Sequence, residues 1–213
     1  MAIVTADDFN RANENLNASA NWQTMHDASG TAIVSSNAAR GGSSGWHGCL
    51  WVNPLGDNDH GVQFQLATKP ANNNGLDLYL RISDTGGAPT GYAVELVPRT
   101  GTDEINFYRI NGASYTSIGS ASREFSSGEW FRATIEGTTL SAYYSTDGIS
   151  WTLISSVTSS TYSTGEYVGF EIEDNVGILD NFGAGDLSVA GGAAGPLVNN
   201  KPIKQLVGGA LAR

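Results

Sequence analysis

The sequence is poor in cysteine, in positive charge and in long apolar runs. Its one cysteine, Cys49, excludes a disulfide within a single chain. No apolar run reaches the roughly 18 residues that a transmembrane helix needs. No segment keeps apolar residues at positions i, i+3, i+4 and i+7, so the pattern argues against helices. These absences indicate a chain built from strands and turns.

Positive charge is scarce, with 11 Lys and Arg residues against 21 Asp and Glu residues. Residues 1–187 hold all 21 acids and eight of the bases, which gives this part a net charge of −13. An acidic surface repels nucleic acid and anionic membranes, so we expect neither as a partner. Residues 188–213 hold Lys201, Lys204 and Arg213 and no acid, which suits an acidic partner surface.

The opening segment, MAIVTADDFN, has neither the basic start nor the apolar centre of a secretory signal. We therefore expect a protein that is not secreted by an ordinary signal peptide and that assembles in a cytoplasm.

Many short segments alternate apolar and polar residues with a period of two, as half-buried strands do. The alternation is clear at residues 62–66, 76–82, 92–96 and 131–135, with turn signals between them. Twenty-seven glycines and abundant Ser, Thr and Asn fit the same interpretation. We predict about a dozen strands in one all-β domain, arranged as a two-sheet antiparallel sandwich.

The last alternating segment, Tyr167 to Phe182, closes the predicted domain. Beyond Leu187 the composition changes to glycine, alanine and small apolar residues, so we expect a domain at 1–187 and an extended arm at 188–213. A closing strand needs a partner with unfilled hydrogen bonds. We predict that Asp8 to Arg11 pairs antiparallel with part of Ile178 to Phe182.

Three segments carry a resemblance to a known fold family: DDFNRA, followed by a tryptophan, then GEWFRATIEGTTLSAYYSTDGISWTLI and VGFEIEDNVGILDNF. Together they resemble concanavalin A-like, laminin-G-like jelly rolls over residues 5–187. Such domains occur in lectins, glycan-binding modules, glycosidases and bacteriophage virion proteins. The resemblance implies a jelly-roll sandwich and leaves these functions open.

The sequence departs from the jelly-roll glucanase pattern Glu-x-Asp-x-x-Glu. Glu171 is followed by Glu173 at the Asp position, and Asn175 and Val176 stand where the second glutamate would be. Because the acid/base residue is missing, we expect no catalytic residues. We interpret Glu171 and Glu173 as exposed neighbours of buried residues, so that replacing either by Gln changes stability only modestly.

Two other groups of residues suggest chemistry weakly. His47 and Cys49 share a strand face, but side chains two residues apart on a strand point in parallel, and no third orienting group is evident. Asp57, Asn58 and Asp59 could supply oxygens to calcium, yet Asx residues also favour turns. We therefore expect no metal and no cofactor, with calcium as the weakly supported alternative.

The polar faces of the predicted strands suggest glycan binding. Sugars are held by aromatic rings together with amide and carboxylate groups. Eight side chains on these faces offer such groups: Gln63, Gln65, Asp77, Tyr79, Arg81, Glu95, Asn106 and Tyr108. The expected glycan-binding residues are five of them: Gln65, Asp77, Tyr79, Arg81 and Tyr108. The alternative is that such residues only pair with one another across a solvated sheet.

The arm combines glycines with apolar residues that have no core of their own to join. Exposed apolar residues on such a segment suit docking onto a partner's sheet edge. Its sequence, PLVNNKPIKQLVGGALAR, resembles the docking tails of phage structural proteins. The expected docking residues are Leu197, Val198, Ile203, Lys204, Leu206, Val207 and Leu211. The alternative is an end with no role.

The sequence thus favours a non-enzymatic structural and binding protein. The first hypothesis is a bacteriophage virion component, either a capsid decoration (cement) protein or a tail protein. Its partners would be other virion proteins or further copies of itself in a homo-oligomer. A carbohydrate-binding, lectin-like module is the second hypothesis, and a glycoside hydrolase is the third.

Overall fold

A computed structural model describes residues 3–25, 28–83, 88–173 and 175–187. Within them the regular secondary structure is all β-strand except η1 (Leu16–Ala18), a single 3₁₀ turn. No described helix has the length and apolar character to cross a membrane. The strands are β1 (Val4–Asp7), β2 (Glu14–Asn15), β3 (Trp22–Thr24), β4 (Ile33–Val34), β5 (Ala39–Arg40), β6 (Trp46–Trp51), β7 (His60–Thr68), β8 (Leu76–Ser83), β9 (Thr90–Val97), β10 (Glu104–Asn111), β11 (Ser114–Ser122), β12 (Trp130–Glu136), β13 (Thr139–Ser145), β14 (Thr152–Thr158), β15 (Tyr167–Glu173) and β16 (Ile178–Asp186).

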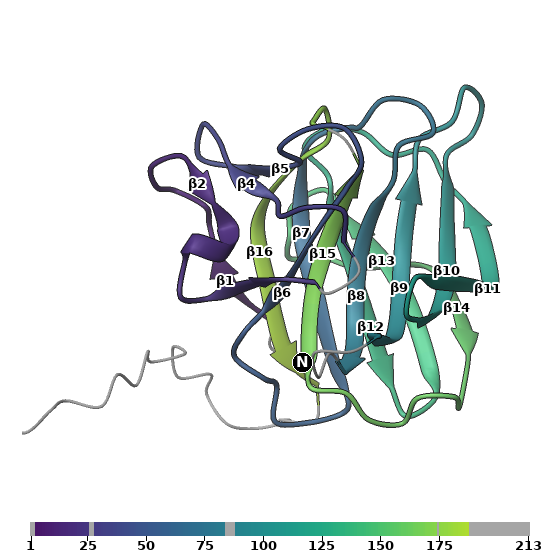
Figure 1. Cartoon of the computed structure of the whole chain (residues 1–213). Coiled ribbons are helices and arrows are strands. Elements are labelled where there is room, and N and C mark those ends of the chain that lie inside the picture. The colour runs from purple at the N-terminus through teal and green to yellow at the C-terminus, as the bar shows by residue number, and fades with distance from the viewer. Residues whose placement is uncertain (1–2, 26–27, 84–87, 174, 188–213) are drawn as a thin grey trace, which may run out of the picture.

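The strands form two antiparallel sheets that lie face to face (Figure 1). Sheet A has nine strands in the order β14-β13-β12-β7-β16-β5-β4-β2, and β1 also pairs with β16. Sheet B has seven strands in the order β11-β10-β9-β8-β15-β6-β3. The structure confirms the predicted all-β jelly-roll sandwich, with more strands than expected because several near the N-terminus are only two or three residues long.

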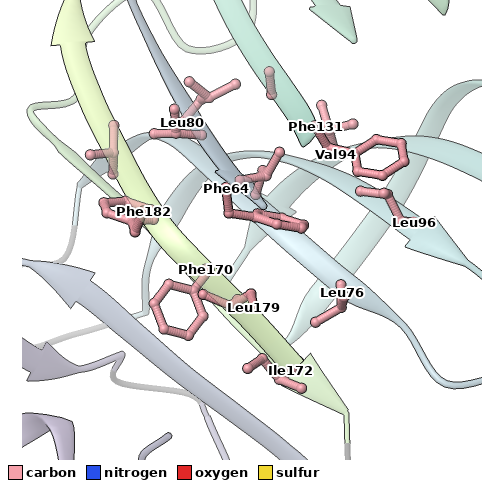
Figure 2. Packing of buried hydrophobic residues seen from close by; sticks show 14 of the residues in the cluster. Phe64, Leu76, Leu80, Val94, Leu96, Phe131, Phe170, Ile172, Leu179 and Phe182 are labelled. Atoms are coloured by element: carbon pink, nitrogen blue, oxygen red, sulfur yellow. The ribbon is translucent and has the colours of Figure 1, made fainter. Parts of the chain in front are cut away.

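The core lies between the sheets and is filled by the apolar members of the alternating segments. Figure 2 shows buried side chains from both sheets in this core: Phe64 and Phe131 from sheet A, and Leu76, Val94 and Phe170 from sheet B. All of these side chains are buried. The period-two pattern therefore identified the inward faces of β7, β9 and β12 correctly, and that of β8 as far as Leu80. Ile82, expected on the same face, instead packs with Tyr79 and Ala93.

An aromatic cluster ties both ends of the domain into this core. The ring of Trp22 lies 5.0 Å from Phe182, 5.2 Å from Phe170 and 5.2 Å from Trp51, and Phe9 stacks on it at 6.1 Å. The indole Nε1 of Trp22 donates a 2.7 Å hydrogen bond to Asp7 Oδ2. A buried indole N–H needs such an acceptor, so Asp7 fixes the ring in place.

The two ends of the domain pair antiparallel in one sheet, but with different residues from those predicted. The register is Val4 with Ala184, Thr5 with Gly183, and Asp7 with Phe182. The predicted pairing of residues 8–11 is wrong because the strand ends at Asp7. Phe9 follows it with a positive φ of 51° and points into the core, and Asp7 Oδ1 accepts its backbone N–H.

The proposed arm, residues 188–213, lies outside the described residues, as do all of its expected docking residues. The division into a domain and an arm therefore stays a prediction.

We predict that Phe182→Ala lowers the free energy of unfolding by about 3–5 kcal/mol, because it leaves a cavity inside the aromatic cluster. Denaturant unfolding followed by tryptophan fluorescence measures the change. The control is Ile149→Ala, at a side chain that is 82% exposed, where the expected change is within about 0.5 kcal/mol. Equal effects of the two substitutions would contradict the role of the cluster.

Candidate functional site

The outer face of sheet B carries three carboxyl groups in a line across neighbouring strands. Glu171 of β15 is directly opposite Asp77 of β8, and Asp77 is directly opposite Glu95 of β9. Side chains directly opposite one another on antiparallel strands have Cβ atoms about 4.5–5.5 Å apart. We call these three residues the acidic row. Asn106 of β10 extends the line and donates a hydrogen bond to Glu95 Oε2 at 3.1 Å.

A second line of residues lies beside the acidic row and supports it. Tyr79 of β8 is flanked by the small residues Gly169 and Ala93 on its two neighbouring strands. The buried Tyr79 hydroxyl donates to Glu171 Oε2 at 2.5 Å and lies 2.8 Å from the Tyr115 hydroxyl. The tyrosines of β8 and β11 thus orient the carboxyl group of Glu171.

The acidic row forms the floor of a pocket with a cavity volume of about 450 Å³. This volume is within the ~300–1,000 Å³ range of small-molecule sites. Its walls are the aromatic rings of Trp46, Tyr108 and Tyr115 together with the side chain of Met25. The rings of Tyr108 and Tyr115 meet edge to face at 5.8 Å. The pocket thus combines apolar walls with a polar floor.

Gly75 lies beside the floor of the pocket, where Glu95, Trp46 and Glu173 approach it. A Cβ atom at this position would lie 2.6 Å from Glu95 Oε1 and 2.8 Å from Cη2 of Trp46, closer than side chains tolerate. The backbone N–H of Gly75 also donates to Glu173 Oε2 at 3.0 Å.

Burial raises the pKa values of the whole acidic row. It raises the pKa of Glu171 to about 7, against the opposing effect of the tyrosine hydroxyls that donate to it. Burial, and then the charges of Glu95 and Glu171, raise the pKa of Asp77 well above its ordinary value. Burial likewise raises the pKa of Glu95. Carboxyl groups so close together resist simultaneous ionisation, so the row retains protons at pH values where free carboxylates are ionised.

Asp77 holds a buried oxygen with no hydrogen-bond partner. The residue is 3% exposed, and its Oδ1 is one of three such side-chain atoms among the described residues. An unpaired buried polar atom costs about 1–3 kcal/mol. Because Asp77 lines the pocket, a ligand there can supply the missing partner.

The structure brings together Asp77, Tyr79 and Tyr108 of the five predicted glycan-binding residues. Gln65 belongs to β7 of sheet A, where its amide donates to Gly128 O and its oxygen accepts from Asn181. Arg81 is 2% exposed and lies away from the outer face. Including Gln65 and Arg81 in one face with the others was therefore wrong.

Arg81 leaves the predicted face because β8 contains an irregularity between Leu80 and Ser83. Arg81 itself has a positive φ of 49°. Its guanidinium group binds Asn58 O at 2.7 Å, Asp59 Oδ1 at 3.0 Å and Tyr162 O at 3.1 Å. A shift of one residue moves each side chain of a strand to the opposite face of the sheet. As a result Arg81, a predicted ligand contact, instead holds two loops together.

The interpretation of Glu171 as an exposed residue was also wrong, because its side chain is 5% exposed. Glu173, also interpreted as exposed, is half-buried. The predicted set further lacked Trp46, Glu95, Tyr115 and Glu171. Glu95 was visible as a polar member of an alternating segment, whereas Tyr115 lies in a polar stretch of β11 that shows no alternation.

The two weaker groups of residues have structural partners. Cys49 is buried in the core, and burial raises the pKa of its thiol to about 12. His47 Nδ1 lies 2.8 Å from Gly45 O. Asp59 Oδ1 accepts from Arg81 and from the N–H of Gly137. Within the described residues no group of three His, Cys, Asp or Glu side chains is arranged to hold a metal ion.

Comparison with known proteins identifies the fold. No family model matches the chain, and no curated protein matches it. Among solved structures, the carbohydrate-binding module CBM66 from Bacillus subtilis is similar at 18% identity and a TM-score of 0.61, over 78% of this chain and 96% of that one. The VIP36 exoplasmic/lumenal domain in its Ca²⁺/Man2-bound form is similar at 14% identity and a TM-score of 0.63, over 86% of this chain and 87% of that one.

The GH43 protein BlXynB from Bacillus licheniformis is also similar, at 13% identity and a TM-score of 0.58. The match covers 84% of this chain and 38% of that one, so it concerns only part of BlXynB. At these identities the likeness concerns the fold. The fold of the chain is that of a two-sheet jelly-roll sandwich.

We predict that Glu171→Gln stabilises the protein at pH 8. A proton held by folded Glu171 up to a pKa of about 7, against the ordinary 4.5, contributes stability that is present below pH 4.5 and lost as the pH rises through 7. The neutral amide avoids this loss, which corresponds to about 3 kcal/mol. Unfolding free energies measured from pH 4.5 to 8.5 test this.

The control for this prediction is Glu136→Gln, which removes an exposed carboxylate at the end of β12. It should leave the pH dependence of unfolding unchanged. Parallel pH profiles for wild type and Glu171→Gln would show that the buried carboxyl titrates normally.

Proposed function

We propose that this protein is a lectin-like module that binds a saccharide in the pocket on the outer face of sheet B. The observation that carries the proposal is the pocket itself, in which aromatic walls stand over a floor of carboxyl groups. Such a pocket can place the C–H face of a sugar ring against Trp46 or Tyr108 while hydroxyl groups donate to Asp77 and Glu95.

The similar folds support this proposal without establishing it. CBM66 is described as a carbohydrate-binding module, and one structure of the VIP36 domain is described as a Ca²⁺/Man-bound form. The virion hypothesis depends on the arm at residues 188–213, which lies outside the described residues. The virion role, the partner docking and the homo-oligomer therefore stay predictions from the sequence.

We predict that Trp46→Ala and Tyr108→Ala each weaken saccharide binding by about tenfold or more, because truncating a central aromatic side chain commonly costs more than 1 kcal/mol. A glycan array identifies the ligand, and titration calorimetry gives the affinities. The control is Trp151→Ala, because Arg132 of sheet A stacks on Trp151 at 3.8 Å, away from the pocket. The proposed site would be contradicted if all three variants lost affinity equally. It would also be contradicted if none of them lost affinity.

We further expect binding without hydrolysis. A retaining glycosidase needs two carboxyl groups about 5–5.5 Å apart that both reach the scissile bond. Glu171 is 5% exposed and its Oε2 is already bound by Tyr79, so it is poorly placed to reach a glycosidic oxygen. Assays of reducing-sugar release on a polysaccharide panel test this. Release that Glu171→Gln abolishes would instead establish a hydrolase.

A further inference from the structure

The pocket concentrates carboxyl groups and has no basic side chain in the described part of its lining. The acidic row supplies three carboxyl groups, and no Lys, Arg or His is among the described residues that line the cavity. The nearest basic influence is Arg99, which favours the ionised form of Glu95. Arg99 is committed elsewhere, with Nη2 2.6 Å from Glu104 Oε2 and Nη1 2.8 Å from Asn73 Oδ1. An anionic sugar is therefore repelled.

The unpaired oxygen of Asp77 indicates what the pocket lacks. Asp77 lines the cavity, and its buried Oδ1 has no hydrogen-bond partner. A sugar hydroxyl offers one O–H, whereas a protonated amine offers three N–H groups and a positive charge. Hydrogen bonds between charged groups are roughly twice as strong as neutral ones. An ammonium group would also interact favourably with the ring faces of Trp46 or Tyr108.

A metal ion suits the pocket less well than an ammonium group. Calcium takes six to eight oxygen ligands. The acidic row offers one carboxyl group from each of three strands, and the described residues contain no metal-type cluster. Two of these carboxyl groups are already bound, Glu171 by Tyr79 and Glu95 by Asn106.

We propose that the pocket selects a saccharide that carries a free amino group, with the ammonium group beside the carboxyl groups of Asp77 and Glu95 and the sugar ring against the aromatic walls. This inference rests on the proposed saccharide-binding function and specifies its ligand class.

Binding of an ammonium group has a second measurable consequence. It stabilises ionised carboxylates, so the acidic row must release protons when the ligand binds near pH 6, where an amine is largely protonated. The groups that act on the row in its unliganded state are Tyr79, Tyr108, Tyr115, Glu173, Asn106 and Arg99. A neutral sugar exerts no such effect and should release few protons.

The experiment uses matched pairs of gluco-, galacto- and manno-configured oligosaccharides, each with a free amine and in its N-acetylated form. Titration calorimetry at pH 6 in buffers of different ionisation enthalpy gives both affinity and proton release. We expect at least one free-amine member to bind about tenfold or more tightly than its N-acetylated partner, with net proton release.

Asp77→Asn should remove most of this preference, because it should weaken binding of the free-amine member by about tenfold or more and weaken binding of the N-acetylated partner less. Glu136→Gln, which removes one exposed charge from sheet A, should leave the preference intact. Melting curves check folding, and Glu95→Gln replaces Asp77→Asn if that variant does not fold, with the same expected loss.

Each contrary outcome identifies which idea fails. Equal or tighter binding of the N-acetylated partners overturns the amine preference but leaves the proposed saccharide-binding function standing. Tight calcium binding that Asp77→Asn abolishes also overturns the inference. Failure of every saccharide, on the pairs and on the glycan array, overturns the proposed function together with the inference.

Discussion

Strand β15 is buried on both of its faces, and the site depends on this constraint. It lies between β6 and β8 in sheet B. Phe170 and Ile172 fill the core on one side, and Glu171 lies beneath the pocket on the other. Met25 and Ala28 approach the outer face of this strand beside Glu171. Glu171 is therefore desolvated, and its burial raises its pKa.

The acidic row is unfavourable for the folded protein unless something binds to it. Like charges directly opposite one another on neighbouring strands are destabilising, and burial strengthens their repulsion. The fold relieves part of this through the hydroxyl of Tyr79 and the amide of Asn106. It leaves Asp77 Oδ1 without a partner. Local disagreement with the rules of stability is typical of functional sites, and here it coincides with the pocket.

The sequence was sufficient to predict the strands but insufficient to predict which strands lie next to one another. Alternation placed Phe64 and Leu78 in the core because a period of two is a local property of the chain. Which strands share a sheet is a long-range property, so Gln65 could not be separated from Asp77 by pattern alone. Arg81 was misplaced because the irregularity in β8 shifts the alternation without a Gly or Pro to mark it. Glu171 was misjudged because alternation does not tell a central strand from an edge strand.

The pocket divides into parts with different structural support, and this division determines how each part can vary. Asp77 and Glu171 stand on adjacent inner strands and are both buried, so changing them alters stability as well as binding. Tyr115 comes from the edge strand β11, and Met25 follows the edge strand β3. Tyr115 is 38% exposed and can change with little effect on packing, whereas Met25 is buried and packs in a cluster with Tyr79. The inner strands β8 and β15 therefore fix the charge that the ligand must carry. The edge strand β11 contributes to the shape of the pocket and is less constrained by the core.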